Sequence, residues 1–348
     1  MHKNTKRILT ALLFIAACAV AYFIIVRGQN NKSASAQIFA MDTYMELTAY
    51  GKNSEDAVRA AKEEIERLDA LLSTGNEKSE IGQLNKKNKK GQISADTQYL
   101  LNRSLTIYEE TDGAFDITIY PVMRAWGFTG EEHRIPSEKE LQDLLQFVDA
   151  SRLQYDANTQ TLMLPEGMEI DFGGIAKGYT SQRVAQIMQE YDITSAILNL
   201  GGNVQLVGAK PDDSSWKVAI KSPDEQEEYL GVLSAQNKAI ITSGGYERYF
   251  EENGRKYHHI IDPKTGMPAY NGLQSVTIVS EDGTLADGLS TALYVMGTES
   301  AITFWQDHSD EFDAILYADD GTLYVTEGIA DTFTSSHSIT VLEKAVAF

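Results

Sequence analysis

The sequence predicts an α+β fold, a mixed, largely antiparallel sheet with helices packed on it. Helical patterns dominate the first half of the chain, and short strand patterns bounded by turn residues dominate the second half. Helices and strands that are segregated along a chain are typical of α+β folds. We expect one body of two lobes, with the ligand site in the cleft between them.

Composition narrows the class of ligand. The 348 residues include 30 basic and 50 acidic side chains, which gives a formal net charge of −20. Such a charge argues against nucleic acid or an anionic membrane surface as a partner. An apolar content of 43% is enough for a large hydrophobic core. An anionic ligand would need local compensation, for which a divalent cation is suited.

Residues 1–27 are predicted to be a membrane anchor or signal segment. Three basic residues precede an apolar run over 8–26, which as a helix is long enough to cross a bilayer. Basic residues before the run favour export of the remaining chain, and therefore a body held outside the cytoplasm at the cell membrane. The run also resembles a bacterial lipoprotein cleavage box, with Cys18 as the acylated residue. It stays apolar after Cys18, which favours an uncleaved anchor.

The remaining chain divides into three segments. Residues 28–37 are polar and rich in Asn and Ser, which predicts a flexible linker. The folded body is expected over 38–335. Residues 336–348 are expected to form a C-terminal tail.

Several helices are predicted from apolar residues at spacings of three and four. Asn53 opens the first, and the second spans 96–110. Ser137 and Glu140 form a capping box before a third. A Gly-Gly turn at Gly174 leads into a fourth, so backbone groups there can approach a ligand closely.

Strand patterns cover much of the rest. Residues 41–50 alternate as a strand, and 153–155 with 161–164 read as a hairpin. Asn253-Gly254 separates two apolar-aromatic runs, which predicts pairing of 246–250 with 256–261 and places His259 on a paired strand. Further strands are expected at 216–220, 229–233, 239–242 and 275–280.

A late helix over 286–296 carries two oxygen-bearing side chains. Asp287 and Thr291 are four residues apart and therefore neighbours on one face. A carboxylate and a hydroxyl together suit a hard cation. Spacing alone favours a plainer interpretation, in which Asp287 caps the helix and Thr291 bonds back to its own backbone.

Five motifs, in one order along the chain, resemble a known family. They are Thr111 to Phe128, Glu169 to Tyr179, Thr242-Ser-Gly-Gly-Tyr-Glu-Arg-Tyr, His259-Ile-Ile-Asp-Pro-Lys-Thr-Gly and Ala286-Asp-Gly-Leu-Ser-Thr-Ala. With them the chain resembles the FAD:protein FMN transferases, the ApbE-like flavin transferases, from residue 38 to about residue 334.

The resemblance implies a set of site residues. The residues implied to contact the flavin dinucleotide are Met41, Ala114, Phe115, Asp116, Asp171, Lys177 and Ile261. Magnesium is implied to bind the backbone carbonyl of Gly174 together with Asp287 and Thr291. Without the resemblance, Phe115 would be interpreted as a core aromatic residue and Asp116 as a turn or cap residue.

The resemblance also implies a reaction. FMN would pass from FAD to a Thr or Ser hydroxyl of an exported acceptor protein, with Mg²⁺ bound and AMP released. Asp287 and His259 would be catalytic, His259 either as a base or as a positioning residue. The acceptor motif, an Asp followed by Ser/Thr-Gly-Ala-Thr, is absent from this chain. The acceptor is therefore expected to be a separate protein, such as a redox-complex subunit.

Two alternatives remain at the level of sequence. Gly75 stands where many members have an aromatic residue near the flavin, which leaves open an FAD pyrophosphatase that yields FMN and AMP. A membrane-tethered flavin-binding protein without turnover is the second alternative.

Overall fold

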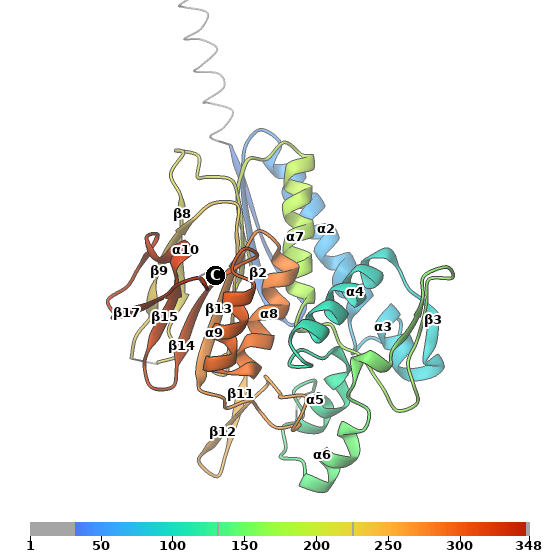
Figure 1. The fold of residues 1–348 in the computed structure, drawn as a ribbon. Helices are drawn as coiled ribbons and strands as arrows, with labels where there is room; N and C mark the ends of the chain where they lie inside the picture. Colours follow the sequence, from blue (N-terminus) through green and yellow to red (C-terminus); the bar gives the residue numbers. More distant parts are fainter. Residues whose placement is uncertain (1–31, 131, 225, 346–348) are drawn as a thin grey trace, which may run out of the picture.

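A nine-stranded sheet forms the centre of the computed structural model, which describes residues 32–130, 132–224 and 226–345 (Figure 1). Its order is β1-β2-β6-β7-β10-β13-β14-β15-β17. Neighbouring strands are antiparallel except β15 and β17, which are parallel. The predicted α+β fold with a mixed, largely antiparallel sheet is therefore confirmed. The strands are β1 (Ser33–Ala40), β2 (Thr43–Tyr50), β6 (Ser195–Leu200), β7 (Asn203–Val207), β10 (Ala239–Gly244), β13 (Leu273–Ser280), β14 (Asp313–Ala318), β15 (Leu323–Thr326) and β17 (Ile339–Leu342).

Helices cover one face of this sheet (Figure 1). They are α2 (Ser54–Leu72), α4 (Ala95–Glu110), α7 (Ala176–Glu190), α8 (Gly283–Met296) and α9 (Thr298–Asp307). The apolar stripe of α2 packs with α7 against β1, β2 and β6. Helices α4, α8 and α9 pack against β10, β13 and β14 in a second, larger cluster. Helix α8 is buried on nearly all sides, so it lies at the centre of the molecule.

A small sheet covers part of the opposite face. It has the order β16-β9-β8, with β8 (Trp216–Lys221), β9 (Tyr229–Ala235) and β16 (Phe333–Thr334). Trp216, Leu233 and Phe333 from this sheet share a hydrophobic cluster with Ile240 and Val279 of the large sheet. The body therefore has three layers of helix, sheet and sheet around α8 and the central strands.

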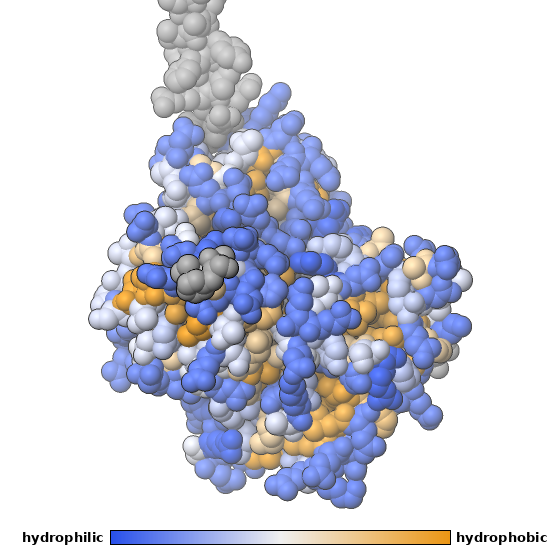
Figure 2. Space-filling view, viewed as in Figure 1, coloured by the Kyte–Doolittle hydropathy of each residue, from blue (hydrophilic) through white to orange (hydrophobic). Residues whose placement is uncertain are grey.

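The remaining elements lie beside these layers. They are α3 (Glu80–Gln83), α5 (Tyr120–Trp126), α6 (Glu138–Leu145), α10 (Glu327–Ala330), a sheet of β3 (Lys90–Gln92), β5 (Thr161–Met163) and β4 (Gln154–Asp156), and a hairpin of β11 (Tyr249–Glu252) and β12 (Arg255–His258). An aromatic cluster around Trp126 joins α5 and α6 to the hairpin. The surface in Figure 2 is mostly hydrophilic, with apolar side chains gathered over the region of α5 and α6.

Most predicted elements are confirmed at nearly their predicted bounds. Helix α2 follows Asn53, and the 153–164 hairpin is β4 and β5. Only half of the predicted capping box forms: the Ser137 hydroxyl accepts from the Glu140 backbone N–H, but the Glu140 carboxylate binds Arg134 instead. An arginine is a stronger partner for a carboxylate than a neutral N–H, which explains the difference.

Two predicted strands are shorter than expected. Met41 and Asp42, with φ of 49° and 57°, form the tight turn between β1 and β2, so the strand begins at Thr43. The hairpin turns at Asn253-Gly254 as predicted, but β12 ends at His258. The prediction that His259 lies on a paired strand is therefore wrong, although its backbone N–H still donates to the Arg248 carbonyl at 3.1 Å.

The linker and the tail are also shorter than predicted. β1 begins at Ser33, because Ala34, Ala36, Ile38 and Ala40 recur at every second position and present one apolar face. The chain after residue 335 is no simple tail either, since β17 pairs with β15 and buries Leu342 in the main cluster. For β1 the alternation within a polar segment is the sequence feature that forms the strand.

The predicted anchor at residues 1–27, including Cys18, lies outside the described residues. Within the described part of the chain, no helix is long and apolar enough to cross a membrane. The core is divided among four hydrophobic clusters, and the division into two lobes stays a prediction.

Removal of β17 tests the corrected C-terminus. A stop codon after Ser336 should lower the free energy of unfolding by about 2–4 kcal/mol, because the Leu342 side chain leaves the core and β15 loses its parallel partner. Urea unfolding of the full chain measures the change. A stop codon after Glu343 retains β17 and is the control. Equal stability of the two truncated proteins would contradict this role.

Candidate active site

The candidate site begins where α7 and α8 cross. An ideal Cβ on Gly178 would lie 2.2 Å from the Gly283 carbonyl oxygen and 2.5 Å from the Asp287 Cβ. Glycine is therefore required at this crossing, since any side chain would force the helices apart. The close approach sets the position of Asp287 against the first turn of α7.

Asp287 caps α7 from another helix. Its Oδ2 accepts from the Gly178 backbone N–H at 2.7 Å, and its Oδ1 accepts from Asn203 Nδ2 at 3.0 Å. The first turn of a helix has N–H groups without intrahelical partners, and Ile175 at the N-cap of α7 has no side-chain hydrogen bond to them. The interpretation of Asp287 as a cap of its own helix is wrong, because α8 starts at Gly283 and Asp282 is its cap.

The Asp287 carboxyl group is buried, with 5% of the residue exposed. Burial raises its pKa, while the positive charge of Lys177 and the hydrogen bonds from Gly178 and Asn203 lower it. Two donors occupy about half of the acceptor sites of a carboxylate. The remaining lone pairs and the excess negative charge are suited to a cation.

Hydroxyl groups lie beside Asp287 along α8. Ser243 Oγ on β10 is 2.8 Å from Ser290 Oγ and 3.4 Å from Thr291 Oγ1. An ideal Cβ on Gly174 would lie 3.7 Å from Thr291 Oγ1, so the Gly-Gly turn reaches the same point. The structure thus brings Gly174 close to Thr291, and Asp287 lies one helical turn before Thr291 on α8.

The oxygen atoms of Gly174, Asp287 and Thr291 are of the types that bind magnesium. Carboxylate, hydroxyl and carbonyl oxygens are the donors that Mg²⁺ prefers, and it commonly keeps several waters and binds substrate phosphates. No group of three or more His, Cys, Asp or Glu side chains suited to a metal occurs among the described residues. A site with one carboxylate would therefore depend on neutral oxygens and on the ligand, and its metal stays a prediction.

Charged side chains converge around Asp287. Lys177, on the first turn of α7, interacts electrostatically with both Asp287 and Glu247. Burial raises the pKa of Glu247, and Lys177 and Lys221 lower it. The Glu247 side chain nevertheless reaches solvent. Glu247 is therefore an exposed member of this charged region.

A second set of charges adjoins the first. The pKa of Asp171 is raised by burial and lowered by its bond from the Gly173 N–H and by the charge of Arg248, while Asp42 raises it. Arg248 is oriented by a hydrogen bond from Nη2 to the Phe128 carbonyl at 2.6 Å. Arg248 acts electrostatically on both Asp171 and His259, and Lys177 also acts on His259, so His259 lies between the two sets of charges.

His259 is neutral and its tautomer is determined by its partner. Nδ1 lies 3.2 Å from the Arg248 carbonyl oxygen, which can only accept, so Nδ1 carries the proton and Nε2 is left as an acceptor. Burial, with the charge of Arg248 as the next cause, lowers the His259 pKa to about 3. Asp262 has other partners, since its carboxylate accepts from the Lys264 backbone N–H and the Thr265 hydroxyl in the next turn.

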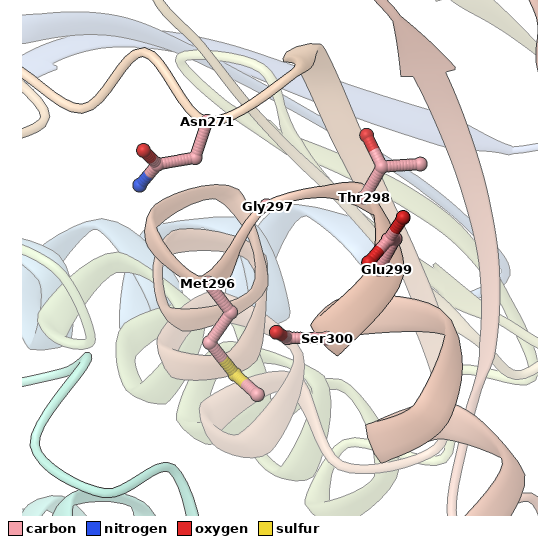
Figure 3. A pocket seen from close by; sticks show the side chains of 6 residues that line it. All are labelled: Asn271, Met296, Gly297, Thr298, Glu299 and Ser300. Atoms are coloured by element: carbon pink, nitrogen blue, oxygen red, sulfur yellow. The ribbon is translucent and has the colours of Figure 1, made fainter.

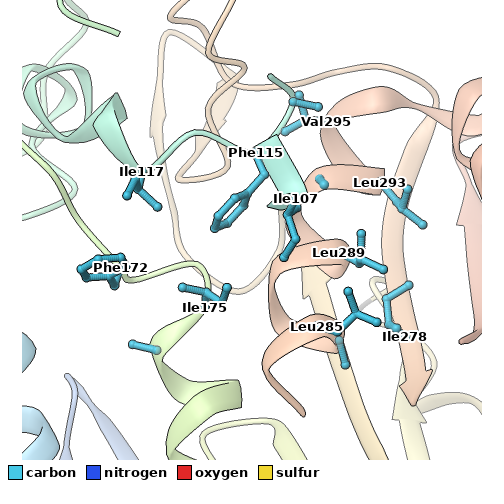
Figure 4. Close-up of a cluster of buried hydrophobic side chains, with 14 of the residues drawn as sticks. Ile107, Phe115, Ile117, Phe172, Ile175, Ile278, Leu285, Leu289, Leu293 and Val295 are labelled. Carbon is cyan, nitrogen blue, oxygen red and sulfur yellow. The ribbon is translucent and has the colours of Figure 1, made fainter. Parts of the chain in front are cut away.

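Other residues implied by the resemblance are mainly structural in their contacts. Asp116 accepts from the Thr118 N–H and hydroxyl and from the Ala150 N–H, as in the cap interpretation. Ala114 and Phe115 are buried in the main cluster. Figure 4 shows the Phe115 ring within this cluster, and an ideal Cβ on Gly174 would lie 3.0 Å from it. Their contact with a dinucleotide stays a prediction.

Met41 and Ile261 have different surroundings. The Met41 backbone N–H donates to Asp69 at 3.0 Å, and its sulfur lies 3.7 Å from the Thr180 hydroxyl of α7. Ile261 is buried with Trp126 in the aromatic cluster. Met41 is therefore oriented towards the crossing, whereas the Ile261 side chain belongs to the core.

A separate open recess lies at the junction of α8 and α9 (Figure 3). It is lined by Asn271, Met296, Gly297, Thr298, Glu299 and Ser300. It adjoins the C-terminal end of α8, whereas Asp287 lies near the N-terminal end. The two sites are therefore distinct.

Sequence reasoning missed four members of the site: Gly178, Asn203, Glu247 and Arg248. Gly178, Glu247 and Arg248 lie inside two of the motifs, and Asn203 lies outside all five. Spacing does not reveal a contact between distant segments. For Glu247 and Arg248, the position in a motif before a hairpin is the signal that was present.

Comparisons with solved structures define the class. The chain aligns with a crystal structure of the ApbE protein of Thermotoga maritima with a TM-score of 0.80 and 31% identity, over 85% of this chain and 98% of that one. It aligns with the flavin transferase ApbE of Vibrio cholerae with a TM-score of 0.78 and 26% identity, over 86% and 99% of the two chains. The fold is thus that of the flavin transferases.

The sequence comparisons give the family. The chain is 30% identical over 340 residues to the FAD:protein FMN transferase of Treponema pallidum, which covers 91% of this chain and 93% of the relative. The ApbE family model matches residues 41–316. The chain belongs to the ApbE family.

The helix crossing can be tested with one methyl group. Gly178→Ala should lower the free energy of unfolding by about 1–3 kcal/mol, because the new Cβ overlaps the Gly283 carbonyl. Thermal or urea unfolding measures this. Gly130→Ala is the control, since no atom lies within 4 Å of its ideal Cβ. A neutral or stabilising effect at Gly178 would mean that the helices are not in contact there.

The histidines make stability depend on pH. Burial lowers the pKa of His258 to about 4 and that of His259 to about 3, below about 6.5 for an unfolded chain. Between pH 6.5 and 3 the unfolded state therefore binds more protons than the folded state. The contribution of the two neutral histidines to stability is complete above pH 6.5 and is lost as pH falls towards 3. Each histidine should lower the free energy of unfolding by up to about 1.4 kcal/mol for each pH unit below 6.5.

Urea unfolding at pH 7.5, 6.5 and 5.5 measures this slope. His259→Gln should reduce the loss between pH 6.5 and 5.5 relative to the unsubstituted protein. An unchanged slope would contradict the buried, neutral state of His259.

Proposed function

We propose that the chain is an FAD:protein FMN transferase that acts on an exported acceptor protein. Membership of the ApbE family and the names of its relatives support this proposal. The observation that carries it is the Asp287 carboxylate at the α7–α8 crossing, with Lys177 beside it and hydroxyls along α8. This arrangement can bind a cation next to a polyanion.

Magnesium, held by Asp287, Thr291 and the Gly174 carbonyl, would neutralise negative charge on the FAD pyrophosphate. Side chains and backbone groups of the chain supply the other positive charges. Lys177 supplies a positive charge on the first turn of α7, whose backbone N–H groups favour an anion. Arg248, tethered at Phe128, supplies a second charge. The three positive groups offset the repulsion expected from a chain with a net charge of −20.

The transfer step needs one nucleophile and one leaving group. The oxygen of an acceptor Thr or Ser hydroxyl bonds to the FMN phosphorus, and the bond from that phosphorus to the bridging oxygen breaks, so that AMP leaves. The hydroxyl proton can pass to Nε2 of His259, which is unprotonated and has an acceptor lone pair. A histidine with a pKa of about 3 is a weak base. His259 therefore acts as a base only when the bound polyanion raises its pKa. Without that rise, His259 positions the hydroxyl.

The partners follow from this reaction. The acceptor is a separate protein with a flavinylation segment of the Ser/Thr-Gly-Ala-Thr type, such as a redox-complex subunit. Residues 1–27 attach the body to the membrane through a spanning helix or a lipid on Cys18, with the site outside the cytoplasm. Strand β1 then separates the membrane side from the Met41 turn by about 26 Å.

Gly75 favours one competing reaction. Its neighbour Ser73 is 3.9 Å from an ideal Cβ, so no bulky group occupies this point of the loop. Without an aromatic wall, water can compete with the acceptor hydroxyl, and the protein would then act as an FAD pyrophosphatase.

One experiment separates these functions. The full chain is incubated with FAD, Mg²⁺ and a carrier protein bearing an Asp-x-x-Ser-Gly-Ala-Thr segment, followed by a fluorescent denaturing gel and AMP measurement. A flavin band on the carrier, with AMP released only when the carrier is present, is expected. Rapid AMP release without carrier would indicate the pyrophosphatase, and intact FAD in all mixtures would indicate a binding protein.

Asp287→Asn tests the proposed metal ligand. Loss of the charge should lower AMP formation on the order of 100-fold, as for the loss of one strong electrostatic contact to a reacting group. Asp282→Asn on the same helix is the control, since Asn caps helices as well as Asp does and Asp282 binds Arg103 outside the site. Full activity of Asp287→Asn would show that the metal assignment is wrong.

A further inference from the structure

The β11–β12 hairpin has one unpaired edge beside the candidate site. The hairpin is a sheet of two strands only, and Figure 1 shows it projecting from the body. All residues of β11 are exposed except Phe250, which is half-buried. The Phe250 ring stacks on Tyr257 and packs against Trp126 of α5. The hairpin is therefore held to the body through one face.

The register of the hairpin shows which main-chain groups point outward. The His259 N–H donates to the Arg248 carbonyl, so these two residues form a hydrogen-bonded pair at the end of the antiparallel ladder. Hydrogen-bonded and non-hydrogen-bonded pairs alternate along such a ladder. Tyr249 and Glu251 then belong to non-hydrogen-bonded pairs, and their N–H and C=O groups point away from β12.

The outer edges of the two strands differ. On β12, the outward carbonyl of Lys256 accepts from the Tyr270 hydroxyl. On β11, no hydrogen bond to the outward N–H and C=O groups of Tyr249 and Glu251 occurs within the described part of the chain. A row of unpaired N–H and C=O groups at a sheet edge is a template for one more strand.

The outer edge of β11 leads directly into the site. Glu247 and Arg248 immediately precede β11, and His259 immediately follows β12. The His259 ring lies over the end of β11, since its Nδ1 is 3.2 Å from the Arg248 carbonyl oxygen. A chain paired with this edge therefore runs towards Arg248 and towards the unprotonated Nε2 of His259.

We infer that the acceptor segment pairs with the outer edge of β11 as a third strand. The inference rests on the proposed transferase function and specifies how its protein substrate binds. A segment of the Ser/Thr-Gly-Ala-Thr type has only small side chains, so it offers little surface to side-chain pockets. Hydrogen bonds from its main chain to Tyr249 and Glu251 supply affinity instead, as in other peptides that add a strand to a sheet edge.

The test uses two matched substitutions at Glu251 in flavinylation of the carrier protein described above. Glu251→Pro removes the outward N–H but retains the bonds between β11 and β12, since proline is tolerated where the N–H faces away from the ladder. Glu251→Thr loses the same carboxylate, with its ion pair to Lys256, and retains the N–H. Glu251→Pro should raise the KM for the carrier about fivefold, as for one main-chain hydrogen bond, and Glu251→Thr less than about twofold.

Two further measurements separate binding of the carrier from damage to the site. The kcat and the affinity for FAD, measured by fluorescence quenching with Mg²⁺, should change less than about twofold in both variants. Residue-resolved amide hydrogen exchange of the unsubstituted full chain, without FAD, should be slowed by the carrier at Tyr249 and Glu251. The Phe250 amide lies inside the ladder and is the control, since it should be protected with or without the carrier and in both variants.

Each outcome decides the inference. A raised KM for Glu251→Pro alone, with slower exchange at Tyr249 and Glu251 when the carrier binds, supports it. An equal KM in the two variants, or exchange that the carrier leaves unchanged, overturns strand pairing and leaves the transferase function intact. If Glu251→Pro loses protection at Phe250, its hairpin is disrupted, and exchange in the unsubstituted protein alone decides.

Two other results also overturn the inference. Slower exchange at Tyr249 and Glu251 that depends on protein concentration, without the carrier, would show that a second copy of the chain occupies the edge. If the unsubstituted protein transfers no flavin to the carrier, the proposed function fails, and the inference of strand pairing fails with it.

Discussion

The site depends on one carboxylate that bridges two helices and a strand. Asp287 on α8 satisfies a backbone N–H in the first turn of α7 and holds Asn203 at the start of β7. Gly178 and Gly283 let the helices approach closely enough for this contact. Because α8 is the buried centre of the body, the position of Asp287 is determined by the whole core rather than by a flexible loop.

This arrangement creates an electrostatic requirement. A buried carboxylate is unfavourable unless positive groups or hydrogen bonds compensate its charge. Lys177, the first turn of α7 and the Asn203 amide provide only part of this compensation. Burial still raises the Asp287 pKa. An additional cation at this carboxylate, as proposed above, would complete the compensation. Glu247, Arg248 and His259 extend the same network, so charge brought by a polyanionic ligand affects all of them.

The two ends of the folded body are the edge strands of the large sheet, and the first of them leads to the site. β1 and β17 are the two edge strands of the large sheet, and both arise from segments that look like a linker and a tail. β1 continues directly into the Met41-Asp42 turn at the site. The proposed anchor, the rigid edge strand and the site are thus consecutive along the chain, and the orientation of the site relative to the membrane would follow from β1.

The sequence by itself determined the fold class, most elements and the family. Apolar periodicity predicts α2 and α4, Asn253-Gly254 predicts the hairpin, and long motifs carry the resemblance, because each of these is encoded by neighbouring residues. Tertiary structure decided which residues form the site. The bond between Asp287 and Gly178 spans 109 positions and depends on two helices packed through glycines. Tertiary contacts elsewhere make Asp116 a cap and Ile261 a core residue. Spacing along a chain describes one element at a time, whereas burial and charge at a site arise from several elements together.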